Sequence, residues 1–125
     1  MTDLTHKSWL STTKSALEKT WYEPVFIAKL IAQLEKDLYP FEIRDVDTKT
    51  LSKEEIILKL TENIRSILIT IEKSSPDAIP QVLYKIDLPQ SIFEEIYKNA
   101  DDINTSLAES ILIREAYKVW MRSQY

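Results

Sequence analysis

The amino-acid sequence contains no glycine in its 125 residues. Average usage would give about nine glycines in a chain of this length. Because glycine adopts positive φ at the least cost, a chain without it can contain few tight turns of the usual kind. The absence also removes the Gly-rich loops that bind phosphate groups and the primed turns of two-residue β-hairpins. The fold must therefore use elements that need few positions with positive φ.

The residue types that most often perform chemistry are also scarce. There is no cysteine, and His6 is the only histidine. Cysteine nucleophiles and most zinc sites are therefore excluded, and a single histidine near the N-terminus is more typical of solvated surface than of a general base, which needs fixed geometry. A di-metal site in a helical bundle needs a histidine three residues after a glutamate, and no glutamate here has one. We expect no cofactor, no metal and no catalytic residue, and hence not an enzyme.

The formal charge of -4 arises from 16 Lys and Arg against 20 Asp and Glu, which are mixed along the chain. This balance disfavours general attraction to nucleic acid or to anionic membranes. No apolar stretch approaches the ~20 residues that a membrane-spanning helix needs, and the first residues lack the apolar core of a signal peptide. We therefore expect a cytoplasmic protein with neither a nucleic-acid nor a membrane partner.

Apolar residues recur with helical spacing along most of the chain, and this pattern predicts an all-α fold. We expect a single helical domain over residues 1–125, built as a compact bundle of five to six helices with a long connector near residues 39–51. The predicted helices cover residues 4–20 and 23–38, a central helix from residue 52 to about 74, one from about 90 to 100, and one from 106 onwards. Between residues 77 and 88 the prolines predict only short helical turns.

Two segments have the spacing of a capping box, in which a serine side chain and a glutamate side chain three residues later each accept a hydrogen bond from the other residue's backbone N–H. Ser52 with Glu55 predicts the start of the central helix, and Ser106 with Glu109 predicts the start of the last one. Pro24 is compatible with the first turn of a helix, where a backbone N–H has no partner. These residues set the expected helix boundaries.

The last predicted helix carries a row of cations, Arg114, Lys118 and Arg122, at spacings of four residues. Cations near a helix C-terminus are favoured by the helix dipole by about 0.3 to 1 kcal/mol each, so the row alone does not require a function. Leu107 and Ile111 fall near the same row, roughly opposite the face predicted to be core. Either the helix packs on both sides, or these five residues form a surface for a partner.

Trp9, Trp21 and Tyr84 are candidates to line an apolar pocket between helices. Core filling is the ordinary role of tryptophan in a small bundle, and Trp120 is expected in the core. Trp9 lies outside the best apolar stripe of its helix, so it is either exposed or closes a pocket against another helix. No set of polar residues identifies a ligand for such a pocket.

Three functions are compatible with these observations. The first is a non-catalytic protein–protein interaction or assembly module, which contacts another protein or a second copy of itself, as in a homodimer, through the last helix and residues 84–93. The second is a helical bundle that binds a small molecule. The third is an acidic inhibitor or immunity-type protein, whose carboxylates would cover a basic partner. The scarcity of catalytic residue types favours the first.

Overall fold

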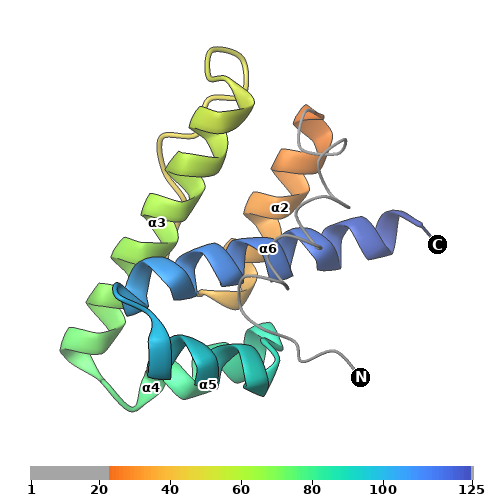
Figure 1. Cartoon of the computed structure of the whole chain (residues 1–125). Helices are drawn as coiled ribbons and strands as arrows, with labels where there is room; N and C mark the ends of the chain where they lie inside the picture. The colour runs from red at the N-terminus through yellow and green to blue at the C-terminus, as the bar shows by residue number, and fades with distance from the viewer. Residues whose placement is uncertain (1–22, 125) are drawn as a thin grey trace.

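The computed structural model describes residues 23–124, and this part of the chain contains five α-helices and no strand (Figure 1). The helices are α2 (Pro24–Asp37), α3 (Lys53–Ser74), α4 (Ala78–Ile86), α5 (Gln90–Asn99) and α6 (Ile103–Ser123). The predicted all-α class is confirmed. The predicted helix over residues 4–20, with the candidate pocket residues Trp9 and Trp21, lies outside the described residues.

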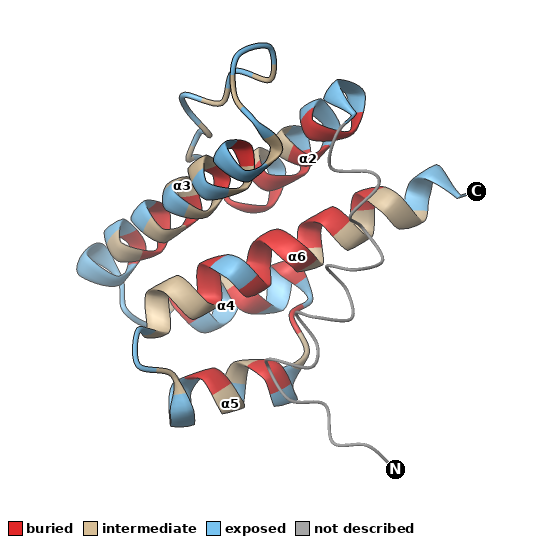
Figure 2. Ribbon diagram, turned by 45° about the horizontal axis from the view of Figure 1, so that its top comes forward, coloured by how far each residue is buried: buried red, intermediate tan, exposed pale blue. Residues whose placement is uncertain are grey.

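Helix α6 is the central element, and it contacts α2, α3, α4 and α5. Helices α2 and α3 lie on one side of it, and α4 and α5 lie on the other (Figures 1 and 2). The sequence pattern points instead to the helix that begins after Ser52 as the central one. Helix α6 takes that place because it buries side chains around most of its circumference, including Leu107, Ser110 and Ile113.

One continuous hydrophobic core joins the helices. Its largest fully buried side chains are Ile27, Leu30, Leu34, Leu60, Ile64, Leu68, Ile86, Ile92, Ile96 and Leu107. The members from α2 and α3 are those that helical periodicity predicts. Within the residues that the structure describes, no helix is both long enough and apolar enough to cross a lipid bilayer.

The capping residues set the starts of the two long helices. The capping box at Ser52 is confirmed, because its Oγ accepts from Glu55 N and Glu55 Oε1 accepts from Ser52 N, both at 3.1 Å. The predicted start of the last helix at Ser106 is wrong. Helix α6 begins at Ile103, where the Asp102 carboxylate accepts from the backbone N–H of Thr105 at 3.2 Å and from its hydroxyl at 2.8 Å. Asp caps a helix at least as well as Ser, so the earlier start prevails.

The segment predicted to form only short turns contains a helix of nine residues, α4. Its proline, Pro80, is the third residue of the helix. The first backbone N–H groups of a helix have no intrahelical partner, so a proline there removes no hydrogen bond. Helix α4 ends at Ile86, and its C-cap residue, Asp87, has φ 65° and ψ 44°. Asp87 thus adopts the left-handed conformation that glycine usually supplies at a helix C-terminus.

Residues 38–52 connect α2 to α3 without a helix or strand. Asn63 of α3 holds this connection in place, since its amide donates to Arg44 O at 2.9 Å and accepts from Arg44 N at 2.8 Å. Glu35 of α2 accepts from Ile43 N at 3.0 Å. The connection is therefore fixed to both of the helices that it joins.

Candidate functional site

The structure contradicts the apolar part of the partner surface predicted on the last helix, which consists of Leu107 and Ile111. Leu107 is 1% exposed and Ile111 is 0% exposed, so neither can contact a partner of the folded protein. The cause is the central place of α6, which has neighbouring helices on several sides. Of the two interpretations of this helix, packing on both sides is the correct one.

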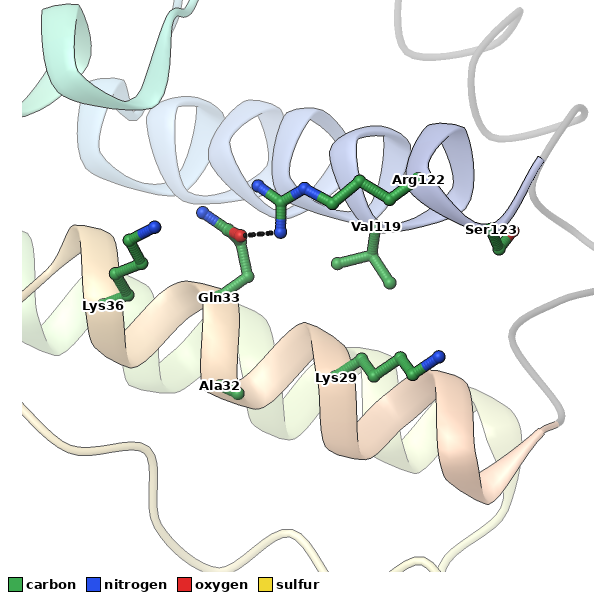
Figure 3. Close-up of a pocket in the computed structure, with 7 residues that line it drawn as sticks. All are labelled: Lys29, Ala32, Gln33, Lys36, Val119, Arg122 and Ser123. Carbon is green, nitrogen blue, oxygen red and sulfur yellow. Dashed lines mark hydrogen bonds between the residues drawn. The ribbon is translucent and has the colours of Figure 1, made fainter. Parts of the chain in front are cut away.

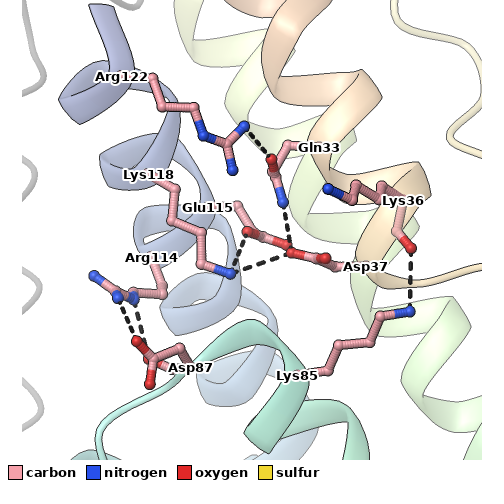
Figure 4. A network of polar contacts seen from close by, with 9 residues as sticks. All are labelled: Gln33, Lys36, Asp37, Lys85, Asp87, Arg114, Glu115, Lys118 and Arg122. Carbon is pink, nitrogen blue, oxygen red and sulfur yellow. Dashed lines mark hydrogen bonds and ion pairs between the residues drawn. The ribbon is translucent and has the colours of Figure 1, made fainter. Parts of the chain in front are cut away.

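Arg114 binds the C-terminal end of α4. Its Nη2 donates to Asp87 Oδ2 at 2.8 Å and its Nε donates to the Asp87 backbone carbonyl at 3.0 Å (Figure 4). Its side chain is 23% exposed. A cation at this position neutralises an aspartate and satisfies a carbonyl that the end of α4 leaves free. Arg114 therefore holds α4 against α6, which is a structural role.

Lys118 lies between two carboxyl groups. Its Nζ is 3.2 Å from Asp37 Oδ2 on α2 and 3.2 Å from Glu115 Oε2 on its own helix. The Lys118 side chain is 17% exposed, and those of Asp37 and Glu115 are 7% and 0% exposed. A buried ion pair requires close geometry because each charge has lost its water. Lys118 is thus an internal cation that joins α2 to α6.

Arg122 continues the same network toward solvent. Its Nη1 donates to Gln33 Oε1 at 2.6 Å, and Gln33 Nε2 donates to Asp37 Oδ2 at 2.7 Å. The two neighbours require the same orientation of the Gln33 amide, because a carboxylate needs a donor and a guanidinium needs an acceptor. A chain of polar contacts therefore runs from Arg122 at the surface to Lys118 in the interior (Figure 4).

The two buried carboxyl groups have opposite electrostatic environments. Burial, and then the contact with Asp37, raises the pKa of Glu115 from its ordinary value of 4.5 to about 8. Burial alone would also raise the pKa of Asp37, but contacts with Glu115, Gln33 and Lys118 outweigh it and lower that pKa below its ordinary value. At neutral pH Glu115 is therefore protonated and Asp37 is the carboxylate that pairs with Lys118.

A pair of carboxyl groups that shares one proton can serve acid–base catalysis where a substrate reaches it. Here Glu115 is fully buried, and the polar groups next to its carboxyl group belong to the protein itself: Lys118 Nζ, 3.2 Å from Oε2, and the side chain of Asp37. A general acid or base must come within hydrogen-bond reach of the proton that it transfers. The Asp37 and Glu115 pair therefore has a structural role in the folded protein.

An open cleft of about 390 Å³ lies between α2 and the C-terminal turns of α6 (Figure 3). Its lining residues are Lys29, Ala32, Gln33, Lys36, Val119, Arg122 and Ser123. Three of them are cations, and two, Ala32 and Val119, contribute apolar groups. Neither Asp37 nor Glu115 lines the cleft. The cleft brings together cations that are far apart in the sequence.

The aromatic pocket that the sequence suggests does not include Tyr84. This side chain is 89% exposed, so the pocket assignment is wrong for Tyr84. On α4 the core positions belong to Ile79, Leu83 and Ile86, which leaves Tyr84 on the outer face. Trp120, expected in the core, is only partly buried and packs against Tyr117 with ring centroids 5.8 Å apart.

Sequence reasoning missed the polar members of the buried stripes. Gln33 and Asp37 share a face of α2 with Leu30 and Leu34, and all four are buried. Glu115 holds the equivalent position on α6, between buried Ile111 and Val119. A polar residue at an apolar position of a helical stripe is the signal that could have found them, because such a group must find a partner on the facing helix.

Among residues 23–124 there is no group of three or more His, Cys, Asp or Glu side chains that could hold a metal ion. Comparison of the chain with protein families, with curated proteins and with solved structures found no match.

Proposed function

We propose that the chain is a non-catalytic protein–protein interaction module of the cytoplasm, which binds another protein or a second copy of itself through its exposed tyrosines at the junction of α2 and α4. The observation that carries this proposal is the exposure of two large aromatic side chains, Tyr84 at 89% and Tyr39 at 80%. We call these two residues the tyrosine surface.

The two tyrosines belong to the same region of the molecule. Lys85, the residue after Tyr84, donates from Nζ to the backbone carbonyl of Lys36 at 3.2 Å. Tyr39 follows Lys36 by three residues, at the end of α2. Helices α2 and α4 are also in contact. The tyrosine surface therefore lies on both sides of one helix junction.

Tyrosine is a residue type that protein interfaces favour, because it buries a large area with few rotatable bonds and keeps a hydroxyl for hydrogen bonding. The short helix that carries Tyr84 is rigidly held, since three apolar residues of α4 are buried and Arg114 binds its C-terminal end. Because the helix is already held in place, binding a partner orders fewer groups and therefore has a smaller entropic cost. These features support recognition at Tyr84.

Site-specific photo-crosslinking tests the proposal. A benzophenone amino acid placed at position 84, in the cells that naturally make the protein, is expected to give a discrete crosslinked product under ultraviolet light. The matched control is position 58, where Leu58 is 57% exposed on α3. The mass of the product distinguishes a second copy of the chain from a different protein.

Light scattering measures the mass of the purified protein in solution and so tests independently whether it forms a homodimer. If position 84 yields no product above that of position 58, the tyrosine surface is not an interface and the proposal is wrong. If position 84 yields a product at twice the mass of the chain, Tyr84→Ser should turn a dimer in solution into a folded monomer.

A further inference from the structure

Three cations line one cleft. Lys29 and Lys36 project from α2 and Arg122 from α6, and within the described part of the chain no ion pair involves any of them. The protein as a whole carries a net charge of -4. Cations gathered in a concave site repel one another, and an anion there would relieve that repulsion.

Arg122 is held in position for such an anion. Gln33, which accepts from Arg122 Nη1 at 2.6 Å, is itself only 6% exposed and is fixed by its 2.7 Å hydrogen bond to Asp37. A guanidinium has five N–H donors, and the contact with Gln33 uses one. Among the described residues, the Arg122 side chain has no other hydrogen bond or ion pair. A positioned guanidinium can bind a carboxylate or phosphate through two parallel hydrogen bonds.

The cleft is elongated. Lys29 and Lys36 are seven residues apart on α2, and their Cα atoms are therefore separated by about 10 Å along the helix axis. Figure 3 shows their side chains toward opposite ends of the cleft, with the Arg122 guanidinium between them. Ala32 and Val119 supply apolar surface along the same length. In this arrangement a compact anion at one end of the cleft lies near one of the two lysines, whereas a longer molecule with an anionic group at each end can contact both.

We propose that this cleft, defined by Lys29, Lys36 and Arg122 with Gln33 beneath them, binds a small organic molecule that carries two anionic groups on a short apolar body. A volume of about 390 Å³ matches the size of sites for such molecules. The anionic groups are carboxylates or phosphates, which share the same recognition by Arg and Lys. This site is independent of the tyrosine surface, so either can fail without the other.

The experiment titrates the whole protein with defined probes and follows backbone amide signals by NMR at 150 mM salt. Adipate, a six-carbon dicarboxylate, is compared with hexanoate, which has the same carbon chain and one charge. Hexane-1,6-diol bisphosphate is the phosphate counterpart. We expect adipate or the bisphosphate to shift amide signals of α2 and of the last turns of α6, with a Kd at least tenfold lower than that of hexanoate. The tighter of the two probes identifies the anionic group.

Charge-removing variants locate the binding. Lys29→Gln, Lys36→Gln and Arg122→Gln should each raise the Kd of the preferred probe about tenfold, since each removes a charge-assisted contact. The control is Lys98→Gln, an exposed lysine on α5 that does not line the cleft and should leave the Kd unchanged. All four residues lie outside the hydrophobic core, so the variants should remain folded.

Several results would overturn the proposal. One is the absence of amide shifts in α2 and α6 with both dianions, and another is equal affinity for hexanoate and adipate. Equal weakening by Lys98→Gln would mean general attraction by charge rather than a site. A hexapeptide with alternating glutamates that binds over tenfold more tightly than either dianion would assign the cleft to an acidic protein segment instead.

Discussion

Glu115 has a fully buried carboxyl group beside that of Asp37, and this makes the stability of the protein depend on pH. In the unfolded chain the pKa of Glu115 is its ordinary 4.5, whereas in the folded protein burial raises it to about 8. Between these values the folded protein keeps a proton that the unfolded chain has released, so the free energy of unfolding falls as the pH rises. The loss reaches at most about 1.4 kcal/mol per pH unit.

Asp37 contributes with the opposite sign. Its pKa is lowered in the folded protein from an ordinary value of 3.8, so the stability that it supplies is present above that value and is lost only in acid. Lys118 influences the pKa of both carboxyl groups, because its ammonium group contacts both of them. The pH range from 5 to 8 therefore reports mainly on Glu115.

The variant Glu115→Gln should remove this pH dependence. Glutamine has nearly the shape of a protonated glutamate and cannot release a proton, so the variant gains stability relative to the wild type as the pH rises from 5 to 8. Urea unfolding at each pH measures the difference. Glu109→Gln, an exposed site on the same helix, should keep the wild-type profile. Parallel profiles for the wild type and Glu115→Gln would mean that Glu115 is already ionised in the folded protein.

At the scale of single residues, the sequence predicts apolar core positions better than polar ones. Leu30, Leu34 and Leu112 are buried as their helical spacing predicts. The roles of Arg114 and Lys118 were not predictable, because their partners, Asp87 and Asp37, lie in distant segments of the sequence. Helical periodicity describes one helix at a time and cannot show which residues face each other across two.

At the scale of the element, the start of α6 provides a direct comparison of two capping residues. Asp102→Ala should lower the free energy of unfolding by about 0.5 to 2 kcal/mol, because it leaves the Thr105 N–H without its acceptor. Ser106→Ala should change it by less than about 0.5 kcal/mol, since Ser106 lies inside the helix. Thermal or urea unfolding of both variants gives the values. The reverse order of effects would show that the helix begins at Ser106.

Helix boundaries were the weakest part of the sequence prediction for a physical reason. Asp102 and Ser106 are both residue types that cap helices, and the structure gives Asp102 a tertiary contact with Arg65, at 3.4 Å, that the sequence does not show. The end of α4 is similar, since Asp87 adopts positive φ in place of a glycine and Arg114 stabilises it there. A chain without glycine thus obtains a left-handed helix terminus from an aspartate with a partner on another helix.

At the scale of the whole molecule, the fold class followed from composition and periodicity, but the arrangement of the helices did not. Helices α3 and α6 have nearly equal lengths, and both carry wide apolar faces. The difference appears only after packing, when α6 lies against α2, α3, α4 and α5. These internal contacts bury the wide apolar surface of α6, for which the sequence also allowed a partner protein.

The central place of α6 predicts that the described helices unfold together. Ile111 is 0% exposed at the middle of α6, so Ile111→Ala should remove about 2 to 5 kcal/mol from the free energy of unfolding. Leu58→Ala, at a side chain that is 57% exposed, should cost less than about 0.5 kcal/mol. Because every other described helix contacts α6, urea unfolding curves from circular dichroism and tryptophan fluorescence should coincide in the wild type and shift together in Ile111→Ala. Curves that separate would show that α6 does not unite the fold, and a near-neutral Ile111→Ala would show that its face is not core.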